Sequence, residues 1–136
     1  MKVKILLVED YDSIRDVYFF ALSEEGFEID TAVSGAEALT RVAAKTYDLI
    51  CLDMVMMQYS GLEFLQAFRA KQPESATKII VLSNIDSPNI VERAKALGAS
   101  QYLIKSHYTP KKLVEVIRKE LNMGTTMPAA GNAPAT

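Results

Sequence analysis

Short apolar runs alternate with longer segments of helical period along most of the chain. The apolar runs cover residues 3–8, 27–33, 48–53, 78–83 and 101–105. After each run, apolar residues recur at the three-and-four spacing that places them on one face of a helix. Ile14, Val17 and Tyr18 begin the first such set. The pattern predicts five strands, each followed by an amphipathic helix.

Residues that favour helix ends stand at the expected boundaries. Ser34–Glu37 and Ser60–Glu63 match the capping box, in which a hydroxyl and a carboxylate accept hydrogen bonds from unpaired N–H groups of the first helical turn. Ser87 and Thr109 each precede a proline, which suits the first position of a helix. Two glycines stand where the first and fourth helices should end, Gly26 and Gly98.

Strict alternation of strands and helices predicts an α/β fold with a doubly wound parallel sheet, because right-handed crossovers place helices on both faces. The runs at 3–8, 48–53 and 78–83 are almost wholly apolar, so we place them at the centre of the sheet. The run at 27–33 alternates apolar and acidic residues, which suits an edge. The expected strand order is 2-1-3-4-5, as in flavodoxin-like folds.

Length and composition favour one domain. The chain has 136 residues, and we assign residues 1–122 to the domain. Residues 123–136, "MGTTMPAAGNAPAT", carry no charge and are rich in Ala, Pro, Gly and Thr. We expect them to form a flexible tail or a linker that this sequence cuts short.

Charge and hydropathy exclude several partners. With 15 Lys+Arg and 17 Asp+Glu, the formal net charge of -2 gives no electrostatic basis for direct binding of nucleic acid or an anionic membrane. The apolar stretch at the start is too short for a signal peptide or a membrane span. The only cysteine, Cys51, lies in an apolar run. We therefore expect a cytoplasmic protein.

Polar and charged residues stand at the ends of four of the five expected strands: Glu9 and Asp10, Asp53, Ser83, and Lys105. Because carboxyl ends of parallel strands share one edge of a sheet, these groups should meet there. Clustered carboxylates repel unless a cation offsets them, and hard oxygen donors suit Mg²⁺ or a similar dication. A hydroxyl and an amine beside them could hold a phosphoryl group. A carboxylate can attack phosphorus, and Asp53, on a central strand, is the best-placed nucleophile.

Four segments together resemble the receiver domain of bacterial response regulators, the phosphoacceptor part of two-component signalling. They are "ILLVEDYDSIRD", "DLICLDMVMMQYSGLEFL", "IIVLSNID" and "GASQYLIKS", in that order, and the resemblance covers residues 1 to about 122. It implies that Glu9 and Asp10 bind Mg²⁺ and that Asp53 is phosphorylated. The backbone carbonyl of Val55 would complete the metal's ligands.

The resemblance also implies a switch. Ser83 would be the switch hydroxyl, Lys105 the phosphate-binding lysine, and Tyr102 an aromatic residue that turns inward on activation. A histidine kinase or phosphotransfer protein would donate the phosphoryl group. The face built by the fourth helix, fifth strand and fifth helix would then bind an output protein or a second copy of the chain. On this interpretation the protein assists its own phosphorylation and dephosphorylation without being an enzyme with turnover.

Three residues depart from the family pattern. Met57 and Ser106 stand where the family usually has proline, and the proline after the lysine often follows a cis bond. A cis bond to serine would cost about 2.5–4 kcal/mol. Asn84 follows Ser83 where a smaller residue is commoner. A bulkier neighbour could hinder the water that hydrolyses an acyl phosphate, so we expect Asn84 to prolong phosphorylation.

Three other interpretations share the same pattern. The chain could be cut from a longer regulator that continues into an effector or kinase domain. A flavin- or dinucleotide-binding protein could share the architecture, although it needs a Ser/Thr-rich or Gly-rich loop where this chain has "EDYD". A metal-dependent phosphoester hydrolase uses similar acids, and turnover of a model phosphoester would identify it.

Overall fold

The computed structural model describes residues 2–56 and 60–123. Strands and helices alternate in the order expected from the sequence. The elements are β1 Lys4–Val8, α1 Asp12–Glu24, β2 Glu28–Ala32, α2 Gly35–Ala44, β3 Leu49–Leu52, α3 Gly61–Lys71, β4 Lys78–Ser83, α4 Pro88–Ala96, β5 Gln101–Ile104, the 3₁₀ turn η1 Lys105–His107, and α5 Pro110–Glu120.

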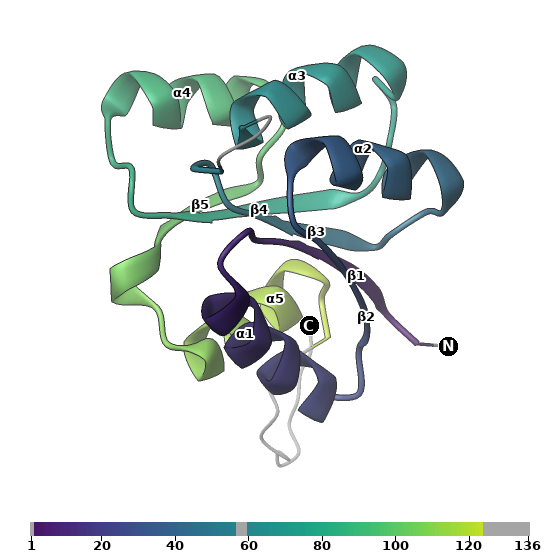
Figure 1. The fold of residues 1–136 in the computed structure, drawn as a ribbon, viewed down its shortest axis with the longest axis vertical. Coiled ribbons are helices and arrows are strands. Elements are labelled where there is room, and N and C mark those ends of the chain that lie inside the picture. Colours follow the sequence, from purple (N-terminus) through teal and green to yellow (C-terminus); the bar gives the residue numbers. More distant parts are fainter. Residues whose placement is uncertain (1, 57–59, 124–136) are drawn as a thin grey trace.

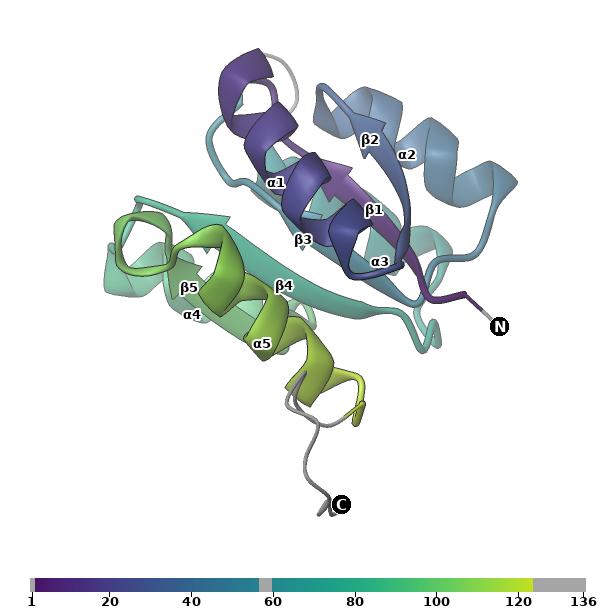
Figure 2. The same cartoon turned by 90° about the horizontal axis from the view of Figure 1, so that it is seen from below.

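The five strands form one parallel sheet in the order β2-β1-β3-β4-β5, which confirms the predicted order. β2 lies at an edge, and four of its five residues are only partly buried. The three predicted central strands are buried along almost their whole length. Helices cover both faces, with α2, α3 and α4 on one side and α1 and α5 on the other (Figure 1). Seen from below, α1 and α5 lie in front of the sheet (Figure 2).

The side chains of the central strands divide between two hydrophobic clusters because successive residues of a strand point to opposite faces. Leu6 and Ile50 pack toward α2, α3 and α4, where Phe64 and Phe68 stack at 5.6 Å between ring centroids. Leu7 packs with the side chains of α1 and α5 on the other face. Across the described residues, no helix is both long and apolar enough to cross a membrane.

The predicted helix starts are confirmed with two differences. Ser60 and Glu63 form the full capping box at α3, and the Thr109 hydroxyl accepts from the Lys112 N–H at α5. At α2 the box is half formed, because the Glu37 carboxylate accepts from the N–H of Val33, one residue before the cap. The side chain of Ser87 makes no capping hydrogen bond at α4.

Both glycines predicted to end helices adopt positive φ, +88° at Gly26 and +101° at Gly98. This conformation suits glycine because a side chain strains it. At Gly98 the carbonyl also lies near Arg69, whose Nε donates to the carbonyl of Leu97 at 2.8 Å. The C-terminal end of α4 is thereby tied to α3.

A third glycine brings α3 against the end of β3. A Cβ built on Gly61 would overlap the carbonyl oxygen of Asp53 and lie 2.8 Å from Cα of Met54. The Gly61 N–H donates to the Met54 carbonyl at 3.2 Å. Glycine therefore lets the start of α3 pack directly on the backbone that carries Asp53.

We expect Gly61→Ala to lower the free energy of unfolding by roughly 1–3 kcal/mol, because the new methyl group meets backbone atoms that must shift. Urea unfolding of both proteins measures the change. Gly26→Ala is the matched control, since its Cβ meets nothing within 4 Å and only its positive φ opposes alanine. A smaller loss for Gly61→Ala than for Gly26→Ala would contradict this close approach.

Candidate functional site

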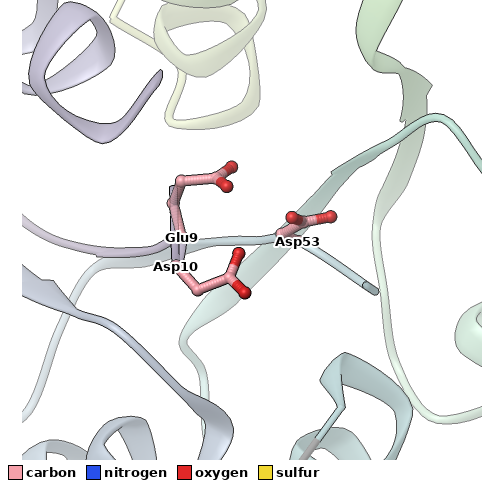
Figure 3. A group of neighbouring side chains, drawn as sticks. All are labelled: Glu9, Asp10 and Asp53. Carbon is pink, nitrogen blue, oxygen red and sulfur yellow. The ribbon is translucent and has the colours of Figure 1, made fainter. Parts of the chain in front are cut away.

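Three carboxylates gather at the carboxyl edge of the sheet, as the sequence predicted. One carboxylate oxygen each of Glu9, Asp10 and Asp53 lies within 4.8 Å of the other two (Figure 3). Glu9 is 4% exposed and Asp53 is 6% exposed, while Asp10 is partly buried. Three carboxylates this close form a concentrated negative charge that water only partly screens.

The sheet register places these acids together. Val8 in β1 pairs with Leu52 in β3, so the residues that follow the two strands emerge side by side. The ladder continues one step further, because the Asp53 N–H donates to the carbonyl of Val8 at 3.2 Å. The Glu9 N–H bonds the carbonyl of Ala32 in β2 at 3.0 Å. Hydrogen-bonded backbone on neighbouring strands therefore holds both carboxylates.

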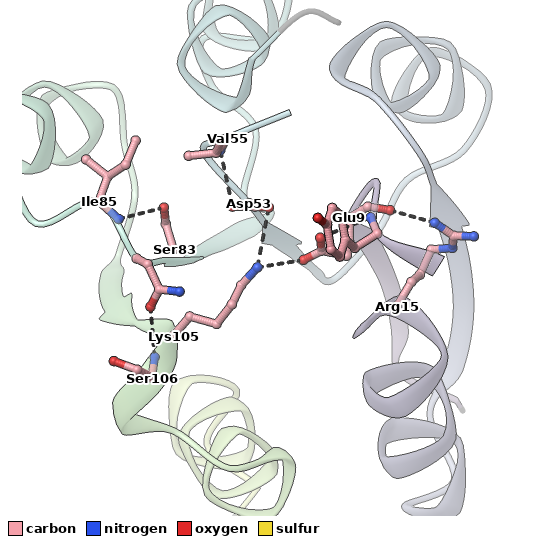
Figure 4. A network of polar contacts seen from close by, with 10 residues as sticks. Glu9, Arg15, Asp53, Val55, Ser83, Ile85, Lys105 and Ser106 are labelled. Carbon is pink, nitrogen blue, oxygen red and sulfur yellow. Dashed lines mark hydrogen bonds and ion pairs between the residues drawn. The ribbon is translucent and has the colours of Figure 1, made fainter. Parts of the chain in front are cut away.

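Lys105 lies between two of the acids. Its Nζ is 2.9 Å from Oε1 of Glu9 and 3.4 Å from Oδ2 of Asp53 (Figure 4). Burial by itself would lower the pKa of Lys105, but the hydrogen bond to Glu9 and the charge of Asp53 outweigh it and raise that pKa. The amine is therefore protonated and offsets part of the negative charge.

The arrangement makes ionisation of Asp53 unfavourable. Burial and the charge of Glu9 raise its pKa to about 6, even though Lys105 and the N–H of Val55 act in the opposite direction. The site therefore favours a proton, or another cation, on this carboxylate. Val55 itself is 55% exposed, so the chain beside Asp53 opens to solvent.

Ser83 and Tyr102 meet at the backbone of one residue, Ile85. The fully buried Ser83 hydroxyl accepts from the Ile85 N–H at 3.2 Å. The hydroxyl of Tyr102, on β5, donates to the Ile85 carbonyl at 2.7 Å. Figure 4 places Asp53 between Ser83 and Glu9. The structure thus brings every predicted site side chain to one edge, with Tyr102 joined to Ser83 through the loop after β4.

Two contacts at this edge were not anticipated from the sequence. Arg15 of α1 donates from Nη1 to the carbonyl of Glu9 at 2.9 Å, and pairs with Asp12. Arg15 lies six residues after Glu9, so its place depends on the direction in which α1 leaves β1. The hydrogen bonds of the Ile85 backbone to Ser83 and Tyr102 could not be predicted, because main-chain groups carry no sequence signal.

The structure describes two of the three residues that depart from the family pattern, Asn84 and Ser106. No peptide bond among the described residues is cis, so the bond between Lys105 and Ser106 is trans. Ser106 instead donates its N–H to Oδ1 of Asn84 at 3.0 Å. Met57 lies outside the described residues, as do residues 124–136 of the predicted tail.

Comparison with known proteins accounts for this combination of fold and site. The family model described as "Response regulator receiver domain" matches residues 5–118. The chain belongs to the response regulator receiver domain family. This membership favours the signalling interpretation over flavin or dinucleotide binding on the same architecture.

Solved structures of similar proteins superpose on most of this chain. Chemotaxis protein CheY4 of Vibrio cholerae superposes with a TM-score of 0.80 at 32% identity, over 88% of this chain and 98% of that one. TrrA of Thermotoga maritima, solved in complex with Mg(2+)-BeF, gives 0.74 at 38% identity, over 88% and 98%.

Curated relatives are longer than this chain. The phosphate regulon transcriptional regulatory protein PhoB of Rhizobium meliloti is 32% identical over 85% of this chain and 51% of its own length. The DNA-binding response regulator MtrA of Mycolicibacterium smegmatis is 30% identical over 95% and 55%. The chain therefore spans about half the length of these relatives, in the part that corresponds to a receiver.

The raised pKa of Asp53 predicts a pH-dependent stability. Folding raises this pKa from its ordinary value near 4 to about 6, so the folded protein binds more protons across that interval and loses stability as pH rises through it. At pH 7, Asp53→Asn should therefore unfold at higher urea, with a gain on the order of 2 kcal/mol. The gain should fade as pH drops from 6 to 4.

Glu74→Gln is the matched control for this measurement. Glu74 is an exposed carboxyl in the loop before β4, at the opposite edge of the sheet. Its substitution should leave the pH dependence of urea unfolding unchanged. A gain for Asp53→Asn that stays constant between pH 4 and 7 would contradict the raised pKa of Asp53.

Proposed function

We propose that the protein is a phosphorylation-controlled signalling switch in which Asp53 accepts a phosphoryl group. The observation that carries the proposal is the protonated amine of Lys105 held between Glu9 and Asp53, within the acidic cluster of a receiver-family chain. The donor is a histidine kinase or a phosphotransfer protein. The receiver domain spans residues 1–122, and residues 123–136 are a tail or linker.

The donor set fits Mg²⁺. Glu9, Asp10 and Asp53 offer three carboxylate oxygens within 4.8 Å, without nitrogen or sulfur ligands, and Mg²⁺ prefers such hard oxygen donors. The carbonyl of Val55 would add a further ligand. When bound, the metal would neutralise negative charge on the phosphoryl oxygens. Replacing Glu9 or Asp10 would remove one metal ligand and leave the proposed phosphoacceptor, Asp53, in place.

Asp53 performs the chemical step. One of its carboxylate oxygens attacks phosphorus, the bond from phosphorus to the donor's imidazole nitrogen breaks, and that nitrogen keeps the electron pair. An acyl phosphate remains on Asp53. Lys105 exchanges its contact with the Asp53 carboxylate for the new phosphoryl oxygens, which bear about -1.5 to -2 charge if they behave like other protein phosphates.

Ser83 carries the change away from the site. Its hydroxyl can donate to a phosphoryl oxygen while it still accepts from the N–H of Ile85, because a hydroxyl has one donor and two acceptor positions. A shift of Ser83 then moves Ile85, and with it the hydrogen bond from Tyr102. The face built by α4, β5 and α5 is altered in this way.

Output passes through binding on that face. The partner is another protein or a second copy of the chain, and nucleic acid is not bound directly, consistent with the net charge of -2. We place the protein in the cytoplasm, where the proposed kinase would phosphorylate it. It acts as phosphoacceptor and assists the gain and loss of the phosphoryl group, without turnover of another substrate.

Intact mass spectrometry after incubation with acetyl phosphate and Mg²⁺ tests the acceptor. We expect wild type to gain one phosphoryl group and Asp53→Asn to gain none, because the amide nitrogen and oxygen are poor nucleophiles. Chelation of Mg²⁺ before the donor is added should abolish the gain. The same gain in both proteins would place the acceptor elsewhere, and no gain in wild type would refute the proposed function.

We expect Asn84→Ala to shorten the life of the phosphorylated protein, since a smaller side chain after Ser83 gives water easier access to the acyl phosphate. The measurement is the decay of phosphorylated mass after the donor is removed. Asn89→Ala is the matched control, because it shortens a different exposed asparagine, one that lies on α4. Equal decay rates in wild type and Asn84→Ala would rule out this effect.

A further inference from the structure

A hydrogen bond joins the residue that follows Ser83 to the residue that follows Lys105. The backbone N–H of Ser106 donates to Oδ1 of Asn84 at 3.0 Å, across 22 residues of chain. Asn84 immediately follows Ser83 at the end of β4, and Ser106 immediately follows Lys105. We call this hydrogen bond the Asn84–Ser106 latch, and Figure 4 draws it at Ser106.

The N–H of Ser106 needs a partner because it lies in the first turn of a helix. Residues Lys105–His107 form the 3₁₀ turn η1, which is closed by the bond from the Tyr108 N–H to the Lys105 carbonyl at 3.2 Å. The first N–H groups of such a turn have no acceptor within it. Ile104, which precedes the turn, provides no side-chain cap.

Asn84 therefore acts as an N-cap supplied from a neighbouring loop. Asparagine is among the preferred capping residues because its carboxamide oxygen accepts well from the first free N–H groups of a helix. Asn84 is exposed, so packing does not fix its side chain in this place. The cap also requires an N–H at position 106, which serine provides and proline lacks.

The capped turn determines the point from which Lys105 reaches the acids. Lys105 is the first residue of η1, and its Nζ lies 2.9 Å from Glu9 and 3.4 Å from Asp53. A lysine side chain is long and flexible, so its amine stays in one place only when the backbone that carries it is fixed. The latch fixes that backbone.

We propose that Asn84 is a positioning residue for Lys105, acting through the Asn84–Ser106 latch. The proposal rests on the proposed phosphoacceptor function and assigns a regulation to that site. Because Asn84 and Ser83 are neighbours, a shift of Ser83 toward a phosphoryl group also moves the cap of η1. The hydroxyl and the amine then approach the phosphoryl group together.

The initial rate of phosphorylation by acetyl phosphate, at saturating Mg²⁺, measures the position of the amine. Asn84→Ala should slow this rate roughly twofold to tenfold, the range that corresponds to one ordinary hydrogen bond. The urea midpoint should stay unchanged because the bond is exposed, which separates positioning from stability. In ¹H–¹⁵N spectra, the Ser106 amide proton should shift upfield when its acceptor is removed.

Two changes at position 106 show whether the effect passes through the N–H. Ser106→Ala keeps the N–H and is the matched control, so its rate should equal that of wild type. Ser106→Pro removes the N–H, and in that background Asn84→Ala should cause no further slowing. A double-mutant cycle over the rates gives the coupling between the two positions.

The possible results separate the two proposals. Slowing by Asn84→Ala that disappears in the Ser106→Pro background supports the latch. An unchanged rate for Asn84→Ala, equal slowing by Ser106→Ala, or undiminished slowing in the Ser106→Pro background overturns the positioning role while the phosphoacceptor function stands. Wild type that gains no phosphoryl group overturns both.

Discussion

The ion pairs of Lys105 with Glu9 and Asp53 are the interactions on which the rest of the site depends. Three carboxylates within 4.8 Å would repel one another strongly without a nearby cation. The amine offsets part of that charge, yet the pKa of Asp53 still rises to about 6. The sheet edge is therefore held in an electrostatic state that an added cation would relieve.

This balance gives the site its chemistry. A carboxylate that is costly to ionise gains from a metal ion at the same oxygens, and the amine beside it suits the oxygens of a phosphoryl group. In the proposed function, the site would combine a nucleophile, a set of oxygen atoms for a metal ion and a cationic partner for an anion. Main-chain hydrogen bonds to adjacent strands hold the backbones of Glu9 and Asp53. Binding of a metal ion would therefore require little rearrangement of these two acids.

The structure also links the site to the surface by short hydrogen-bonded steps. Ile85 accepts from Tyr102 and donates to Ser83, while Asn84 accepts from Ser106. These contacts join the loop after β4 to β5 and to the turn that follows it. A change at the buried hydroxyl can therefore reach the α4–β5–α5 side through a few residues that are close in sequence to the site.

The sequence by itself determined the strand order and the gathering of Glu9, Asp10, Asp53 and Lys105, because apolar periodicity locates strands and parallel strands place their ends at one edge. It predicted the capping box at Ser60 fully and the one at Ser34 in part. Only the tertiary structure decided the capping of Ser106 by Asn84 and the contact of Arg15 with Glu9. The capping of Ser106 depends on how two segments 22 residues apart in the chain approach each other, and the contact of Arg15 depends on the direction in which α1 leaves β1. No local pattern of residues encodes either arrangement.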